Sequence, residues 1–292
     1  MAGLLLAVLR AARRTASGRE QEYEKLSLAL TTRIYWRVIS DHRAVELFHL
    51  HFVRLLSSGP SKGSFAIKGG CNLRFFFGSV RYSEDIDLDV AGLPVPSLKE
   101  KVSTILSRPA MSLALRSRAI AVTSVSAPKQ TEKTQRWKIG LAAEGHAVPL
   151  HTKIEFSRRN TTEEAKVEPI APSILAEHQL MPFIAAHYPL AAAMRQKVGA
   201  LTGRSIVQAR DVFDLGVLFA KSGGKVDALK PIRSLLPKAI ERAMDVSYAD
   251  FKSQVGSYLQ PDHLDTYGSR EAWDALQMRV VELLEKARHE RP

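Results

Sequence analysis

Residues 65–90 read FAIKGGCNLRFFFGSVRYSEDIDLDV, and this stretch decides the fold. It begins with three apolar residues, continues through a Gly69-Gly70 pair, and ends in six residues that alternate between aspartate and an apolar side chain. Alternation with a period of two is typical of a strand with one acidic and one apolar face. Residues 72–77 contain no helix breaker and are predicted to be helical. The stretch therefore predicts a strand, a glycine turn, a helix and a second strand.

The acidic face of the second strand needs an explanation, because neighbouring carboxylates repel one another. Side chains two residues apart share a face, with Cα atoms about 6.5 Å apart, so Asp85 and Asp87 can converge on one point. Their repulsion separates their pKa values unless a cation neutralises it. Mg²⁺ and Mn²⁺ prefer hard oxygen ligands, so a divalent metal site is predicted. A solvated acidic face on an exposed edge strand is the alternative.

The glycine pair lies between the first strand and the start of the helix. Glycines there let backbone N–H groups approach phosphate oxygens, and the helix N-terminus adds a favourable dipole. A third carboxylate would complete a site for two cations, which suits phosphoryl or nucleotidyl displacement. Glu155, which shares a strand face with Lys153, is one candidate, and Asp89 is the other.

The whole chain is basic, with 42 Lys and Arg against 30 Asp and Glu in 292 residues, a net charge of +12. Such a field concentrates polyanions, so nucleotides or nucleic acid are the expected partners, unless the charge only aids solubility. Cys71 is the single cysteine, which excludes an intramolecular disulfide and favours a cytoplasmic location. No apolar run is long enough to span a membrane, so no membrane partner is expected.

Periodicity predicts the remaining elements. Two helices are expected within residues 20–56, interrupted near residues 40–41, and another at 95–106. Antiparallel strands are expected at 113–126, 135–142 and 150–156. From residue 172 onward the pattern is helical, with helices at 190–201, 206–221, 231–244, 248–258 and 270–288. The expected fold class is α/β (α+β), with an N-terminal helical segment at 1–62, a mixed-sheet core at 63–172 and a helical domain at 173–292.

The run IKGGCNLRFFFGSVRYSEDIDLDV resembles the first motif of the AbiEii/AbiGii family of nucleotidyltransferase-like toxins, which belong to type IV toxin-antitoxin systems and include MenT-like proteins. The superfamily signature is Gly-Gly or Gly-Ser followed by Asp-x-Asp on the next strand. Gly69, Gly70, Asp85 and Asp87 match it by position. The later segments HTKIEF (151–156), RQKVGAL (195–201) and QARDVFDL (208–215) resemble further family motifs in the family's order.

This resemblance implies a nucleotidyltransferase-like core in which Asp85 and Asp87 hold the metal, Lys197 contacts the nucleotide phosphates and Asp211 is an essential acid. Arg74 and Arg81 could bind a triphosphate or simply balance the acidic strand. The predicted metal ligands are Asp85, Asp87 and Glu155, the predicted catalytic residues are Asp85, Asp87, Lys197 and Asp211, and the predicted nucleotide-binding residues are Lys68, Gly69, Gly70, Arg74, Arg81, Lys153 and Glu155.

Three other residues have simpler interpretations. An ordinary ion pair between Arg210 and Asp214, on the polar side of their helix, is favoured over a catalytic role. Cys71 is not expected to be a nucleophile, because no partner histidine is evident in the sequence.

The expected activity is transfer of a nucleotide from a nucleoside triphosphate to RNA, dependent on Mg²⁺ or Mn²⁺. The resemblance points to the tRNA 3′ end as acceptor and to a toxin neutralised by a separately encoded antitoxin. Transfer to a protein or small molecule is an alternative, although a small-molecule pocket would be acidic. A non-catalytic nucleic-acid- or partner-binding module on the same fold is another. The paired carboxylates argue against such a module, because an inactive copy has no reason to tolerate their repulsion.

Overall fold

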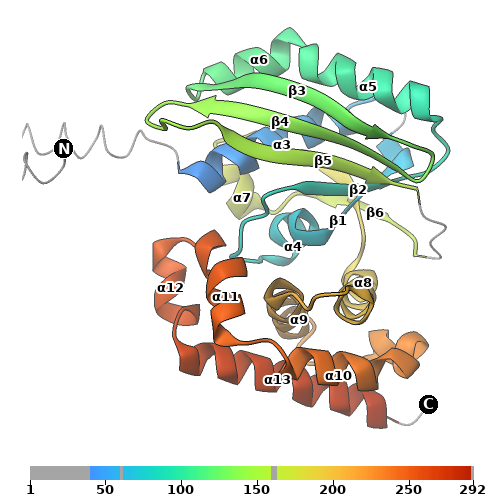
Figure 1. The fold of residues 1–292 in the computed structure, drawn as a ribbon. Helices are drawn as coiled ribbons and strands as arrows, with labels where there is room; N and C mark the ends of the chain where they lie inside the picture. The colour runs from blue at the N-terminus through green and yellow to red at the C-terminus, as the bar shows by residue number, and fades with distance from the viewer. Residues whose placement is uncertain (1–39, 60–61, 159–162, 291–292) are drawn as a thin grey trace, which may run out of the picture. The chain divides into compact units, whose positions relative to one another are not determined.

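The computed structural model describes residues 40–59, 62–158 and 163–290, and a mixed sheet of seven strands runs through this part of the chain (Figure 1). The strand order is β3-β4-β5-β2-β1-β7-β6. Strand β2 is antiparallel to β1 and parallel to β5, while β1 is parallel to β7. The strands are β1 (Phe65–Lys68), β2 (Ile86–Val90), β3 (Ile120–Gln130), β4 (Thr134–Ala143), β5 (Leu150–Ser157), β6 (Lys166–Pro169) and β7 (Ile184–His187).

The stretch at residues 65–90 folds as its pattern predicts. Strand β1 leads directly into helix α4 (Gly69–Phe77), which begins at the glycine pair, and β2 follows after a loop. Gly69 makes the turn with φ of 64°, a left-handed conformation that favours glycine. Gly78, with φ of 75°, ends the helix by donating its N–H to the carbonyl of Leu73. The short segment thus places a helix N-terminus beside the acidic strand.

Helices cover the two faces of the sheet unequally. On one face, α3 and α6 pack against the β3-β4-β5 part, where side chains of β4 such as Trp137 and Ile139 are buried, and α5 packs against α3 and α6. On the other face, α4 packs against β1 and β2, and α8 and α9 pack against α4 (Figure 1). The bounds are α3 (Asp41–Ser57), η1 (Lys62–Ser64), α5 (Val95–Ser107), α6 (Pro109–Arg116), α7 (Pro172–Glu177), α8 (Leu190–Gly203) and α9 (Ala209–Lys221).

The C-terminal helices share one hydrophobic core, which includes Leu73 from α4 and Trp273 from the last helix. This core therefore connects the helices to the glycine turn at the start of α4. The remaining elements are η2 (Asp227–Leu235), α10 (Leu236–Met244), α11 (Tyr248–Gln254), η3 (Gly256–Tyr258), α12 (Pro261–Tyr267) and α13 (Arg270–His289). In the described part of the chain, none of the helices has both the length and the apolar character of a membrane span.

The fold class is confirmed, and β3, β4 and β5 at one end of the sheet are antiparallel as expected. The prediction that a strand begins at residue 113 was wrong, because this residue lies in α6. Pro109 occupies the first turn of α6, where its fixed φ favours a helix, and the helix continues to Arg116. Ala119 then turns the chain with φ of 55°, and β3 starts at Ile120.

The purely helical interpretation after residue 172 was also wrong, because β7 lies at Ile184–His187. It pairs with β1 at Ile67 and carries β6 on its other side, so the sheet extends beyond the boundary expected at residue 172. Four-residue strands are too short to show a clear periodicity. The expected domain division stays a prediction, and the helix expected before residue 40 lies outside the described residues.

Candidate active site

Four charged side chains form a row across one face of the sheet. Lys68 on β1 pairs in register with Asp87 on β2, which pairs with Glu155 on β5, which pairs with Arg136 on β4. Residues that pair directly across neighbouring strands point to the same face. Three of the residues predicted from sequence, Lys68, Asp87 and Glu155, are therefore brought together by strand pairing.

Asp87 is the centre of this row, and its carboxylate lies next to the glycine turn. A Cβ atom built on Gly69 would lie 3.2 Å from Asp87 Oδ2. Burial raises the pKa of Asp87, and the nearby carboxylates of Glu155 and Asp85 raise it further, while Lys68 and Lys197 act in the opposite direction. Within residues 40–59, 62–158 and 163–290, this carboxylate has no hydrogen bond or ion pair of its own. Asp87 is therefore the carboxylate of this row that lacks a direct partner among the described residues.

Asp85 lies directly before β2 and is held by Lys153. Its Oδ1 accepts the backbone N–H of Lys153 at 2.9 Å, and its Oδ2 pairs with the ammonium of the same residue at 2.7 Å. Burial raises the pKa of Asp85 although Lys153 counteracts this. The Lys153 side chain is 41% exposed, so its ammonium can move into water when another cation binds Asp85.

Glu155 and Asp89 have different partners. Asp89 receives a hydrogen bond from Lys68 and another from the Tyr188 hydroxyl at 2.8 Å, so both its oxygens are occupied. Glu155 is bound through one oxygen only, Oε2, by Arg136 at 2.6 Å. It also lies close enough to Asp87 to raise the pKa of that residue. The geometry favours Glu155 over Asp89 as the third carboxylate.

Gly69 is favoured by its left-handed φ, and Gly70 is favoured because a side chain there would lack space. A Cβ at Gly70 would lie 2.6 Å from Ser83 Oγ, which is closer than real Cβ atoms approach other atoms. Ser83 in turn donates a hydrogen bond to the carbonyl of Asp85 at 2.7 Å. The start of α4 is thus packed tightly against the loop that carries the first aspartate. Its N-cap residue, Lys68, provides no side-chain cap, so the first backbone N–H groups stay available to an anion.

Lys197 on α8 is buried between two aspartates of α9. Its ammonium lies 3.1 Å from Asp211 Oδ1 and 2.5 Å from Asp214 Oδ2. Burial alone would lower the pKa of Lys197, but Asp214 and Asp211 raise it, so the side chain stays charged. Asp211 is also bound by Arg204 at 2.8 Å. The predicted pair Lys197 and Asp211 is in direct contact, and the charge of Lys197 also acts on Asp87.

Asp214 lies in a different environment from the one that its sequence pattern predicted. It is fully buried rather than on a polar helix face, and it pairs with Arg81 and Lys197 instead of Arg210. Both its oxygens accept from Arg81, at 3.0 and 3.2 Å. Arg81 also donates to the carbonyl of Tyr82, so its guanidinium is committed to fixing α9 against the loop before β2. A role in nucleotide binding stays a prediction for Arg81.

Arg74 lies in a separate buried cluster. It binds Glu46 through two hydrogen bonds and Glu177 through a third, and its guanidinium lies over the ring of Tyr82. Glu46, Glu177 and His178 are close enough to share a metal ion. However, Arg74 and His178 already bind the Glu46 carboxylate, which makes this cluster a structural link between α3, α4 and α7. The nucleotide-binding role expected of Arg74 stays a prediction that this geometry does not favour.

Cys71 has a histidine neighbour that the sequence did not reveal. Its sulfur lies 3.7 Å from His49 Nδ1, although 22 residues separate the two. Burial raises the pKa of the Cys71 thiol well above its usual value and lowers the pKa of His49 to about 3. A neutral thiol beside a neutral imidazole is not an activated nucleophile. The residue packs under the site without chemical participation.

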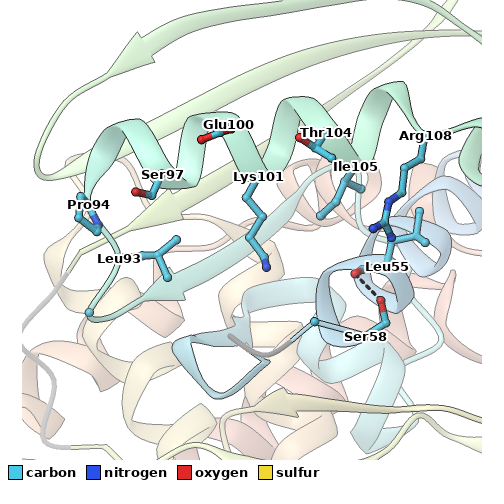
Figure 2. Close-up of a pocket in the computed structure, with 12 residues that line it drawn as sticks. Leu55, Ser58, Leu93, Pro94, Ser97, Glu100, Lys101, Thr104, Ile105 and Arg108 are labelled. Carbon is cyan, nitrogen blue, oxygen red and sulfur yellow. Dashed lines mark hydrogen bonds between the residues drawn. The ribbon is translucent and has the colours of Figure 1, made fainter.

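A hollow of about 740 Å³ lies away from the carboxylates, between α5 and the C-terminal end of α3 (Figure 2). Its lining residues include Lys101 of α5, Arg108 directly after α5, and Leu55 of α3. None of the candidate site residues lines it. The carboxylate row and the glycine turn therefore remain the candidate active site, separate from this hollow.

Comparison with known proteins identifies the family and the fold. The family model described as nucleotidyl transferase AbiEii toxin, type IV TA system, matches residues 52–290. JHP933 from Helicobacter pylori has a TM-score of 0.56 at 16% identity, over 86% of this chain and 93% of that one. MenT4, a nucleotidyltransferase toxin from Mycobacterium tuberculosis H37Rv, has a TM-score of 0.55 at 17% identity, over 85% of this chain and 86% of that one. At these identities the structures show a common fold alone. No curated protein matches the chain.

The family model defines the class of protein, a nucleotidyltransferase. The chain belongs to the AbiEii family of nucleotidyltransferase toxins from type IV toxin-antitoxin systems, because the family model covers most of its length. The family expected from four sequence motifs is confirmed. The match also reaches the C-terminal helices, which those motifs left uncovered.

Neutralising Asp87 should stabilise the metal-free protein. Its raised pKa means that ionisation opposes folding, so Asp87→Asn should increase the free energy of unfolding at neutral pH in the presence of a chelator. The gain should shrink as pH falls through the raised pKa, because the wild-type carboxyl then binds a proton. Thermal unfolding measures it, since about 1 kcal/mol shifts the Tm of a domain of this size by about 2–4 °C.

Asp89→Asn is the matched control on the same strand. Asp89 is held by Lys68 and Tyr188, so its neutralisation should bring no gain in Tm. Equal stabilisation by both substitutions would show that the charge of the whole strand matters, rather than the lack of a partner at Asp87.

Removing Asp214 should have the opposite effect. Asp214→Ala leaves Arg81 and Lys197 without their shared counter-charge in a buried position, which typically lowers the free energy of unfolding by about 3–5 kcal/mol. Exposed Asp265 is the control, because Asp265→Ala should stay within about 0.5 kcal/mol of wild type in denaturant titration. Similar losses for the two variants would contradict a buried network that depends on Asp214.

Proposed function

We propose that the protein transfers a nucleotide from a nucleoside triphosphate to an RNA acceptor, with the tRNA 3′ end as the target, in a divalent-metal-dependent reaction. In this reaction an acceptor hydroxyl attacks the α-phosphorus, the bond to the β-phosphate breaks, pyrophosphate leaves and the hydroxyl proton is released. The observation that carries the proposal is the Asp87 carboxylate, which lies between Asp85 and Glu155 beside a helix N-terminus and has no partner among the described residues.

The residues present fit a metal ion of the Mg²⁺ or Mn²⁺ type. Asp85, Asp87 and Glu155 offer hard carboxylate oxygens, and Asp87 has no other cation bound to it among the described residues. When bound there, such an ion would neutralise these carboxylates and the charge that develops on the phosphate oxygens. Without it, the chain balances Asp85 with Lys153 and Glu155 with Arg136.

The triphosphate is assigned to the start of α4. Gly69 and Gly70 bring backbone N–H groups to the surface at the positive end of the helix dipole, where phosphate oxygens are stabilised. The buried ammonium of Lys197 on α8 adds positive charge, and Asp211 and Asp214 keep it in place. Lys68 and Lys153 lie on the strands at either side of Asp87, within reach of the same anion.

RNA is favoured as the acceptor by the net charge of +12. Membership of a toxin-antitoxin family supports a separately encoded antitoxin as a protein partner and a cytoplasmic target. The alternatives are transfer to a protein or small molecule, and a non-catalytic binding module. The module is disfavoured by the same observation at Asp87, because a binding surface gains nothing from an unpaired carboxylate.

The direct test is incubation of the purified protein with total tRNA, Mg²⁺ and each of the four α-labelled triphosphates in turn. Label should enter RNA from at least one triphosphate and be abolished by a chelator. Asp87→Asn should lower the rate at least about 100-fold without loss of folding, because it removes a carboxylate from the reacting centre. Asp265→Asn is the control and should label RNA like wild type.

Two outcomes would contradict the proposal. Undiminished labelling by Asp87→Asn would place the reaction elsewhere in the molecule. RNA binding without labelling from any triphosphate would favour the non-catalytic module.

A further inference from the structure

The face of the sheet that carries Asp87 continues beyond the carboxylates. On β5 and β4, Lys153 pairs in register with Lys138, next to the pair of Glu155 and Arg136. On β3, Ser126 pairs with Lys138 and Lys129 pairs with Arg136. Strand pairing keeps partners on the same face. We call the surface formed by Lys129, Arg136, Lys138 and Lys153, together with Ser124 and Ser126, the basic sheet face.

The helices that cover this part of the sheet lie on its other side. Trp137, Ile139 and Leu141 of β4 point to α3, α5 and α6 and are buried, whereas Lys138 between them is exposed. Thr152 of β5 likewise points to α3, where its hydroxyl contacts His49 at 2.7 Å. The described residues therefore leave the basic sheet face open (Figure 1).

The four cations of this face are not equivalent. Lys153 and Arg136, nearest the site, are bound to Asp85 and Glu155. Lys138 on β4 and Lys129 on the edge strand β3 are exposed and have no ion pair within the described part of the chain. With strands about 4.8 Å apart, Lys129 lies three strand spacings from Asp87, or roughly 15 Å; Lys138 lies two spacings away and two residues further along its strand, or roughly 12 Å. An extended polyanion whose reactive end lies at Asp87 would therefore pass both lysines within a few of its repeating units.

We propose that the basic sheet face is where the acceptor RNA lies, with its phosphates at Lys129 and Lys138 and its reactive end at Asp87. This inference rests on the proposed function and names the acceptor side of the site. The complementary charge supports it, because free lysines and serine hydroxyls are typical phosphate contacts. A protein partner fits less well, because interface cores are rich in aromatic residues and poor in lysine.

The test is RNA binding by the full chain, measured by fluorescence anisotropy with labelled total tRNA over a series of salt concentrations. Lys129→Ala/Lys138→Ala should weaken binding about tenfold near physiological salt and make the slope of log K against log salt shallower by about 1.4. Lys129→Arg/Lys138→Arg should bind like wild type, because it keeps both charges. The matched control is Lys99→Ala/Lys238→Ala, which removes the same charge from α5 and α10 and should leave the slope unchanged.

A second readout separates this inference from the proposed function. In the labelling assay, the Lys129/Lys138 alanine variant should show a raised KM for RNA, with unchanged kcat at saturating RNA and unchanged affinity for the triphosphate. An unchanged KM in an active enzyme would overturn the inference and leave the function standing. Lysine-dependent RNA binding by a protein that transfers no label would support the surface and overturn the function. Unaltered RNA binding together with loss of a bound protein partner would make the face a protein interface and overturn the inference.

Discussion

The rest of the site is organised around one constraint, a carboxylate that the described part of the protein does not neutralise. Asp87 is brought beside Glu155 by parallel pairing and beside the start of α4 by the left-handed turn at Gly69. Each of these neighbours is fixed by backbone geometry, so the charge cannot relax by moving away. Burial and two other carboxylates raise its pKa, which means that the fold bears an electrostatic penalty at this position. A penalty of this kind is typical of sites that bind a cation in function.

The buried carboxylates of α9 differ from Asp87, because each of them has cationic partners. Arg81, Lys197 and Arg204 face Asp211 and Asp214, and the hydrogen bonds among them satisfy both aspartates. Such a network holds its members at fixed positions, because removing one leaves a buried charge without a partner. It joins α8 and α9 to the loop before β2. The C-terminal helices thus position Lys197 behind the site, while the strands present the carboxylates.

Local pattern was sufficient to predict the central parts of this arrangement. The period of two around Asp85 and Asp87, and the glycines before a helix, are properties of a few consecutive residues. Nonlocal contacts were not predictable. Strand register, which pairs Asp87 with Glu155, depends on how β2 and β5 meet, and Asp214 reads as a surface helix residue until Arg81, 133 positions away, is placed beside it. Similarly, His49 approaches Cys71 only after α3 packs on the sheet, and β7 is too short for its alternation to appear.

We propose that Asp87 and Asp85 together bind a divalent cation in function, with Lys153 pairing with Asp85 in its absence. Anomalous diffraction from crystals grown with Mn²⁺ and a non-hydrolysable nucleoside triphosphate tests it most directly. The expected result is a manganese peak coordinated by Asp87 and Asp85, with the triphosphate at Gly69 and Gly70. Manganese bound only at the cluster of Glu46, Glu177 and His178, or nowhere near the acidic strand, would contradict it.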